Sequence, residues 1–268
     1  MVNPHKSLLA ARANLPQPDK NSAAMWIDSQ KLDYRELNHR LREAIAAGET
    51  EFTLIGVNGQ RYIADAVRGK IRFDIFGVPG NDLGAFMDGP EILVHNNAQD
   101  AVANTMNDGR IVVRGDAGDV LGYGMRGGRL YVRGNVGYRV GIHMKAFREQ
   151  RPILVAGESA GDFFGEYMAG GILVLLSLSG NGKSQVGDYC ASGMHGGQIY
   201  LRGEVDPYLV ATEHVGITAA CEQELAVLRP ILADYCEVLG VELDDVLRVP
   251  FSRLAPLSNR PFSSKYAT

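Results

Sequence analysis

The sequence predicts a parallel β-helix, a solenoid in which each turn of the chain stacks on the one before. The first observation is a row of methionines: Met87, Met106, Met125 and Met144 stand 19 residues apart, and Met168 and Met194 follow after 24 and 26 residues. The second is that small residues, glycines and aspartates recur in phase around them. The third is a short apolar strand pattern after each methionine. Self-similarity at a fixed period is typical of a stacked architecture.

The in-phase residues predict how each coil turns its corners. Three residues before the methionines stand Gly84, Ala103, Gly122, Gly141, Gly165 and Ala191. Glycine suits corners where a positive φ is needed. Most coils also carry a Gly-Asp pair, and we expect each aspartate to cap its own turn. Methionine fills irregular gaps, so we expect the methionine row inside the coil.

Each repeat also carries one clear strand signal. The expected strands span residues 71–76, 91–95, 110–114, 129–133, 152–156, 171–176 and 198–202. A 19-residue unit is too short for a strand and a crossover helix, but it suits a coil of three short strands. Equivalent residues should then stack at the spacing of paired strands, about 4.8 Å. Two insertions, residues 145–151 and 177–184, should emerge as loops, which often lie on a binding face.

Residues 1–50 are expected to form an N-terminal tail and a capping helix. Asp33 and Glu36 resemble a capping box at the start of this helix. Leu37, Leu41 and Ile45 give it one apolar stripe, and a glycine follows at the expected end. Such a helix would cover one end of the solenoid at residues 51–205, because an open end exposes apolar core and unpaired strand edges.

Residues 206–268 are expected to contain helices and an extended arm. Residues 219–239 have helical periodicity with a kink or restart at Pro230, and Gly240 ends the pattern. The segments 250–256 and 259–262 contain too much proline for a helix. They predict an arm that either wraps its own stack or reaches a neighbouring chain.

Composition narrows the class of protein. The formal charge of −4 and pI of about 5.9 argue against a nucleic-acid partner. The sequence has no run of about 18 apolar residues, so we expect no membrane span. Cys190, Cys221 and Cys236 form no CxxC pair, and the chain begins with no apolar export segment. We therefore expect reduced thiols and a cytoplasmic protein.

Two patterns suggest phosphate or calcium binding, and both fit poorly. Residues 180–184 resemble the end of a phosphate-binding loop, but Ser177 stands where its first glycine belongs, and a Gly-Asp corner follows instead of a helix. Calcium-binding β-helices repeat every nine residues or so. This repeat has 19 residues, and Tyr138 interrupts the aspartate row.

No catalytic, cofactor-binding or metal-binding residue is predicted in this chain. The histidines, which are His5, His39, His95, His143, His195 and His214, do not share a position in the repeat. Ser159 and Ser192 have no evident histidine beside them, as a serine nucleophile requires. The chain starts with Met1 rather than cysteine, so we expect no N-terminal-nucleophile amidotransferase.

The most irregular polar stretch runs from Tyr138 to Lys145 and breaks the Gly-Asp rule beside the first insertion. One interpretation is a solvated corner. The other is a subunit interface formed by Tyr138, Arg139, His143 and Lys145.

Several strings in these corners resemble one protein family. They are GYRVGIHMK at residues 137–145, GDFFGEYMAGG at 161–171, NTMNDG at 104–109 and GMHGG at 193–197. Together they resemble the GXGXG domain of the glutamate synthase large subunit in its stand-alone, archaeal-type form. NRPF at 259–262 resembles the C-terminal ending of that form. The resemblance covers roughly residues 26–266.

This resemblance implies a right-handed parallel β-helix without catalytic residues. It implies two partner subunits: a class II glutamine amidotransferase that releases ammonia, and an FMN and iron–sulfur protein that reduces an imino intermediate to glutamate. FMN and the iron–sulfur cluster would then belong to a partner. Related complexes make N-methylglutamate, and the sequence does not separate the two products. The C subunit of formylmethanofuran dehydrogenase shares the glycine repeat, so a scaffold role in that kind of complex is the alternative.

Overall fold

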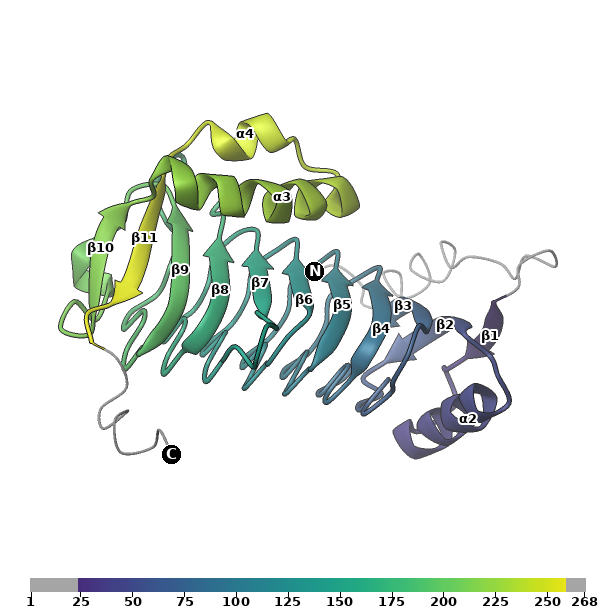
Figure 1. Cartoon of the computed structure of the whole chain (residues 1–268). Helices are drawn as coiled ribbons and strands as arrows, with labels where there is room; N and C mark the ends of the chain where they lie inside the picture. The colour runs from purple at the N-terminus through teal and green to yellow at the C-terminus, as the bar shows by residue number, and fades with distance from the viewer. Residues whose placement is uncertain (1–23, 259–268) are drawn as a thin grey trace, which may run out of the picture.

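The computed structural model describes residues 24–258 and shows a mainly β fold, a solenoid of about six turns (Figure 1). Eleven strands of the described residues form one sheet in the order β1-β2-β3-β4-β5-β6-β7-β8-β9-β11-β10. Strands β1 to β9 are paired in parallel, one coil to the next. The predicted parallel β-helix is confirmed. The NRPF string at 259–262 lies outside the described residues.

The strands follow the predicted period. Their bounds are β1 Met25–Asp28, β2 Glu51–Asn58, β3 Arg72–Val78, β4 Asp88–Val94, β5 Asp108–Val113, β6 Arg129–Val132, β7 Ile153–Ala156, β8 Ala169–Leu175, β9 Gly196–Arg202, β10 Val215–Ala219 and β11 Phe251–Pro256. The helices are α2 Tyr34–Ala46, α3 Glu222–Leu239 and α4 Leu243–Leu247, with a short 3-10 turn η1 at Pro207–Leu209.

The methionine row lies inside the solenoid, where all six side chains are 0–3% exposed. It packs beside a strand row in which Ile111, Leu130, Leu154, Leu173 and Ile199 are in register and fully buried. The methionines also explain a glycine row on the next coil. A Cβ added at Gly128 would lie 2.3 Å from the terminal methyl of Met106, and Gly197 has the same relation to Met168 at 2.7 Å.

The coil differs from the three-strand expectation. Each coil has one strand in the main ladder. A second ladder consists of single bridges that join Ala98, Ala117, Val136, Ala160 and Val186. Hydrogen-bonded turns form the rest of the coil. Its tight corners leave too few extended residues for a third strand.

The aspartates do not cap their own turns, so that expectation was wrong. Asp100 Oδ1 accepts a hydrogen bond from the backbone N–H of Asp119 at 3.0 Å, and Asp119 Oδ1 accepts one from Tyr138 at 2.9 Å. Asp100 and Asp119 therefore each bind the coil that follows, and Asp162 does the same through the backbone N–H of Asp188. Gly118 and Gly137 leave room for these side chains, since a Cβ there would lie 2.0 Å and 1.9 Å from the Oδ1 atoms. These two glycines provide space for the aspartates, whereas the positive φ expected at the corners is found at Gly122 and Gly141, with values of 65° and 76°.

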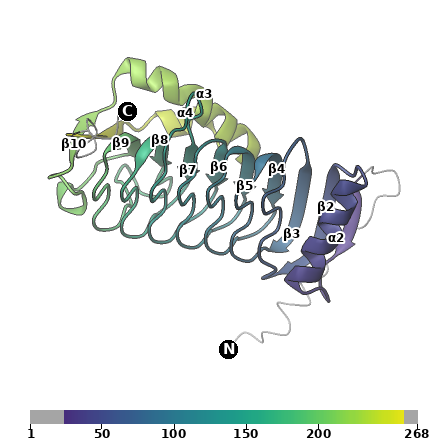
Figure 2. The same ribbon diagram turned by 60° about the horizontal axis from the view of Figure 1, so that its bottom comes forward.

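Helix α2 covers the N-terminal end of the solenoid (Figures 1 and 2). The Asp33 carboxylate accepts hydrogen bonds from the backbone N–H groups of Arg35 and Glu36, at 2.7 Å and 2.9 Å. Leu37 and Leu41 are buried against the first coils. The Glu36 side chain pairs with an arginine one turn later rather than with the N-cap backbone, so the capping box is only half formed.

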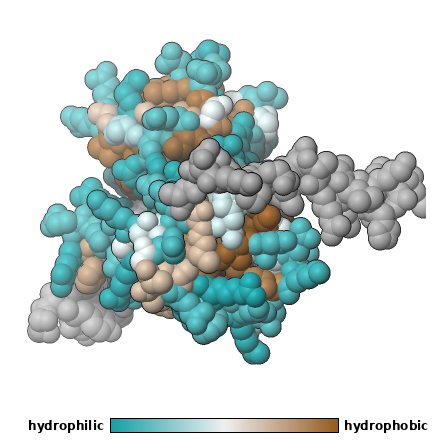
Figure 3. Space-filling model, turned by 90° about the vertical axis from the view of Figure 1, so that its right-hand side faces the viewer, coloured by the Kyte–Doolittle hydropathy of each residue, from teal (hydrophilic) through white to brown (hydrophobic). Residues whose placement is uncertain are grey.

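The opposite face of α2 is hydrophilic. Arg40, Arg42 and Glu43 are exposed on it. Hydrophilic residues accordingly dominate much of the surface seen from this end (Figure 3). A polar outer face is what a terminal cap of a repeat protein requires.

The C-terminal segment covers a side and an end of the solenoid. Helix α3 packs Leu228, Leu232 and Tyr235 on the outer face of the middle and later strands, where Tyr131 and Tyr200 are buried (Figure 1). It contains Pro230 and ends at Gly240, whose φ is 66°. The segment expected as an extended arm is β11, which pairs antiparallel with β9 and with β10. The described part of the predicted arm thus pairs with its own stack.

Asp234 fastens α3 to the sheet. Its carboxylate accepts hydrogen bonds from Arg110 at 3.0 Å, from Tyr131 at 2.9 Å and from Arg129. Partial burial alone would raise the pKa of Asp234, but the hydrogen bonds from Tyr131 and Arg129 outweigh it and lower that pKa. Burial and the neighbouring carboxylate in turn raise the pKa of Tyr131, so its hydroxyl stays a donor.

We expect Asp234→Asn to lower the free energy of unfolding at pH 7 by about 1.5–3 kcal/mol, the range for hydrogen bonds to charged groups. Because the pKa of Asp234 is lower in the folded than in the unfolded chain, folding favours the ionised carboxylate. The stabilisation by the ionised carboxylate is fully present above the unfolded-state pKa of about 4. It is lost as the pH falls from there through the folded-state pKa. Urea unfolding from pH 7 to pH 3 should show the two proteins converging; a constant difference would contradict this assignment.

Candidate subunit interface

The corner that precedes each methionine has an unusual backbone. In the coil before Met144, Arg139, Gly141 and His143 have φ values of 57°, 76° and 54°. The N–H groups of Arg139 and His143 donate to carbonyls of the following coil, and that of Gly141 donates to the preceding coil, at 2.8–3.1 Å. Left-handed φ is costly for residues other than glycine. Hydrogen bonds to both neighbouring coils hold the strained corner in place.

We call the six corners together the corner face: residues 81–86, 100–105, 119–124, 138–143, 162–167 and 188–193. Exposed aromatic side chains gather on it. Phe86, Tyr123, Tyr138, Tyr167 and Tyr189 are 41–60% exposed. Exposed apolar patches of this kind on soluble proteins mark interaction sites.

The rings of the corner face are ordered along the solenoid axis. The His143 ring lies between Tyr123, at 5.7 Å and edge-on, and Tyr167, at 5.4 Å and stacked. A second stack joins Phe163 and Tyr189 at 5.1 Å. Because successive coils present these rings at regular intervals, they form two short rows.

An ion pair lies beside the second row. Arg139 donates to the Glu166 carboxylate at 2.7 Å, and its guanidinium lies 4.8 Å from the centre of the Phe163 ring. The Glu166 side chain is only 8% exposed, whereas that of Arg139 is 47% exposed. Arg139 is therefore fixed in place and still accessible, which is the state of a preorganised recognition residue.

The structure brings the four predicted interface residues onto one coil. Tyr138, Arg139 and His143 lie on the corner face, and all three are exposed. Lys145 lies just past the buried methionine, where the first insertion begins, and it is also exposed. Their contact with a partner remains a prediction.

Sequence reasoning missed the other members of this surface. They are Phe86, Tyr123, Phe163, Tyr167 and Tyr189. The signal was present, because these aromatics occupy fixed offsets of one, two or five residues before a methionine. The offsets of the glycines and aspartates predict corners, but they do not indicate which side chains share a surface.

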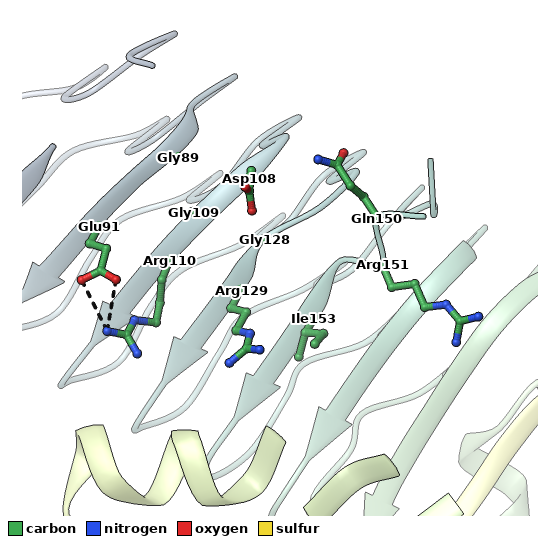
Figure 4. A pocket seen from close by; sticks show the side chains of 10 residues that line it. All are labelled: Gly89, Glu91, Asp108, Gly109, Arg110, Gly128, Arg129, Gln150, Arg151 and Ile153. Atoms are coloured by element: carbon green, nitrogen blue, oxygen red, sulfur yellow. Dashed lines mark hydrogen bonds and ion pairs between the residues drawn. The ribbon is translucent and has the colours of Figure 1, made fainter. Parts of the chain in front are cut away.

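A groove runs along the starts of the strands in the main ladder. One pocket in it has a volume of about 380 Å³ and lies over the glycines 89, 109 and 128 (Figure 4). Arg110 pairs there with Glu91 from the neighbouring strand, at 3.4 Å, while Gln150 and Arg151 come from the turn before β7. Arg151 also lines a second pocket, of about 390 Å³, over Gly171 and Gly197.

Among the described residues, Ser159, Cys190 and Cys236 lack the surroundings of a nucleophile. The Ser159 hydroxyl donates to Asn135 at 2.7 Å and not to a histidine. Burial raises the pKa of Cys190 to about 12 and of Cys236 to about 11, so both remain thiols at neutral pH. The loop at 177–184 is followed by a bridge residue and a corner, as predicted, rather than by a helix.

A comparison with protein families matches residues 50–254 to the model described as the GXGXG motif. The chain belongs to the GXGXG family. This is the family of the C-terminal domain of the glutamate synthase large subunit. The GXGXG chain is also similar to a relative called "Uncharacterized protein MJ1350" of Methanocaldococcus jannaschii. The two are 43% identical over 260 residues, which cover 92% of this chain and 98% of the relative.

The strings that carry the family resemblance coincide with the surface described above. GYRVGIHMK and GDFFGEYMAGG include the corners of two adjacent coils of the GXGXG chain, with the Arg139–Glu166 pair between them. Within residues 24–258, no helix has both the length and the apolarity to cross a membrane.

Proposed function

We propose that the GXGXG chain is a non-catalytic assembly subunit of a glutamate synthase-like complex and that its corner face docks a partner subunit. The observation that carries this proposal is the exposed, ordered row of aromatic rings and Arg139 on a chain of this family. The partners we propose are an FMN and iron–sulfur synthase-like subunit and a class II glutamine amidotransferase subunit.

Physical chemistry supports a docking role for this face. Aromatic residues and arginine are enriched at protein interfaces, and binding energy concentrates in a few of them. A rigid solenoid loses little conformational entropy on binding, because the hydrogen bonds between coils already fix the corners. The same rigidity suits a scaffold that must hold two enzymes in register.

Under this proposal the chemistry belongs to the partners. The amidotransferase supplies ammonia from glutamine, and the flavin and iron–sulfur subunit supplies electrons to an imino intermediate. The product is glutamate, or N-methylglutamate in a complex that makes it from glutamate and methylamine. This chain contributes no cofactor ligand and positions the two active sites.

The test is reconstitution from the purified GXGXG chain and its two proposed partners. The isolated chain should show no flavin absorbance and no glutaminase activity, and the three chains should co-elute in gel filtration. Tyr167→Asn combined with Tyr189→Asn should weaken assembly by roughly 30-fold or more, as loss of hot-spot residues does. Asparagine is chosen because it tolerates the left-handed backbone at both positions.

Tyr208→Asn is the matched control. Tyr208 is 97% exposed but lies on η1, outside the corner face. The Tyr208→Asn variant should assemble with the partners as well as the wild type does. Flavin bound by the isolated chain would refute the non-catalytic role, and equal loss in the control would refute the corner face as the docking site.

A further inference from the structure

One segment of this acidic protein is strongly basic. Residues 126–151 contain seven arginine and lysine residues and a single acidic residue, Glu149. Since the whole chain has 27 cationic and 31 acidic residues, the remainder has 20 and 30. The positive charge is therefore concentrated on the middle coils.

Four of these cations have no acidic partner among residues 24–258. Arg129, Arg133 and Arg139 each pair with a carboxylate. The four without such a pair in the described part of the chain are Arg126, Lys145, Arg148 and Arg151, and all are exposed. Arg126 and Lys145 directly follow Met125 and Met144, so they occupy equivalent positions on adjacent coils. Lys145, Arg148 and Arg151 lie in the first insertion, residues 145–151, which we call the basic turn, and Arg126 lies on the coil before it.

The basic turn is a defined structure. Phe147 and Gln150 exchange two backbone hydrogen bonds, at 3.1 Å and 3.0 Å, and so close a two-residue turn. Arg148 occupies its left-handed position, with φ of 57°, and its guanidinium lies 5.1 Å from the Phe147 ring centre. Phe147 is itself 48% exposed. An aromatic ring and an arginine at a closed tip have the composition and rigidity of an interface hot spot.

Open space lies beside the basic turn. Arg151 lines one pocket with Gly89, Gly109 and Gly128 (Figure 4), and it also lines a second pocket with Gly171 and Gly197. A partner segment at the turn could enter this space.

We propose that the basic turn and Arg126 dock an acidic polypeptide segment of a partner subunit. The inference rests on the proposed function, because it names the chemistry of a partner at the edge of the same coil. Four accessible cations on two adjacent coils, one of them against the exposed Phe147 ring, match a segment that carries several carboxylates and an apolar side chain. Charge complementarity of this kind sets association rate and specificity.

The extent of the patch favours a polypeptide over a nucleic acid. Arg126 and Lys145 each directly follow a methionine of the repeat. On the two preceding coils this position is occupied by Asp88 and Asn107, and on the two following coils by Ala169 and His195. The basic area thus spans two coils, about 10 Å at the strand spacing. A nucleic acid presents a continuous row of phosphates, and the net negative charge of the remaining surface would repel them.

The first experiment uses the full chain and a fluorescein-labelled octaglutamate peptide, read by fluorescence anisotropy. The wild type should bind the peptide at about 50 mM NaCl and lose it at about 300 mM, as expected for screened charges. Arg148→Glu combined with Arg151→Glu should weaken binding at least about tenfold. The matched control is Lys183→Glu combined with Arg229→Glu, which makes the same charge change at exposed positions elsewhere.

Two comparison probes test the alternatives in the same assay: an oligothymidylate of equal net charge and vesicles containing phosphatidylglycerol. Tighter binding of either probe than of the peptide overturns the proposal, as does equal loss in the control variant. Unchanged circular dichroism spectra and melting temperatures of the variants exclude loss of folding as the cause.

The second experiment uses the reconstituted complex and a carbodiimide, which joins the Lys145 amine to a carboxylate in direct contact. Mass spectrometry should find Lys145 linked to an aspartate or glutamate of a partner subunit. A link to a second copy of this chain, or none in an intact complex, overturns the inference and leaves the proposed function standing. Failure of the complex to form, with peptide binding intact, counts against the proposed function alone.

Discussion

Replacing Met106 by aspartate is expected to prevent the solenoid from folding. The Met106 side chain is fully buried, and its terminal methyl lies against Gly128 of the next coil. An ionised carboxylate there would have no partner, and its burial would cost several kcal/mol. A whole domain is stable by only about 5–15 kcal/mol. Far-ultraviolet circular dichroism and the soluble yield should both report the loss.

Met106→Leu is the control for this change, because it conserves volume and apolarity. Its expected cost is below about 1.5 kcal/mol, measured by urea unfolding. A folded aspartate variant with the melting temperature of the wild type would show that position 106 is not internal, and the stacking scheme would then be incorrect.

The second large effect is expected from Gly118→Ala. A Cβ at this position would lie 2.0 Å from Asp100 Oδ1, the atom that accepts the N–H of Asp119. Either the hydrogen bond between coils breaks or the coils separate, so we expect a loss of about 1–3 kcal/mol in the free energy of unfolding. The φ of Gly118 is not in the left-handed region, so alanine introduces a clash without backbone strain.

A double-mutant cycle isolates that clash. Asp100→Ala removes the crowding oxygen, after which the closest remaining atom is the backbone nitrogen of residue 100, at 3.2 Å. In that background Gly118→Ala should cost much less, with a coupling energy of about 0.5–3 kcal/mol. Additive costs from equilibrium unfolding would mean that the aspartate and the glycine are independent, contrary to the geometry.

The sequence predicted the solenoid because its strongest constraints are local and periodic. A buried row must repeat wherever the coils stack, so the spacing of Met87 and Met106 gives the period directly. The cap at α2 was also predictable, since Asp33 and the stripe of Leu37 and Leu41 are local signals. These features can be predicted without knowing which coils lie next to each other.

The remaining features depend on contacts between coils, which a linear reading does not contain. The Asp100 side chain binds a residue 19 positions later, whereas a turn-capping aspartate binds within its own turn. Likewise, the periodicity of α3 indicates an apolar stripe but not the face that it covers. That face is set by Tyr131 and Tyr200, which point out of the solenoid on distant strands. The corner face was half predicted, through Tyr138, Arg139 and His143.

The threading of β11 between β9 and β10 has a consequence for biosynthesis. A ribosome makes β9 and β10 before β11, yet β10 is paired with β11 and not with β9. Until residues 251–256 emerge, β9 has an open edge and β10 has no neighbour in the sheet. The early coils can stack during translation. Closure at the far end must wait until residues 251–256 have emerged, and during that interval the unpaired strand β10 is open to capture by a chaperone or by another nascent copy.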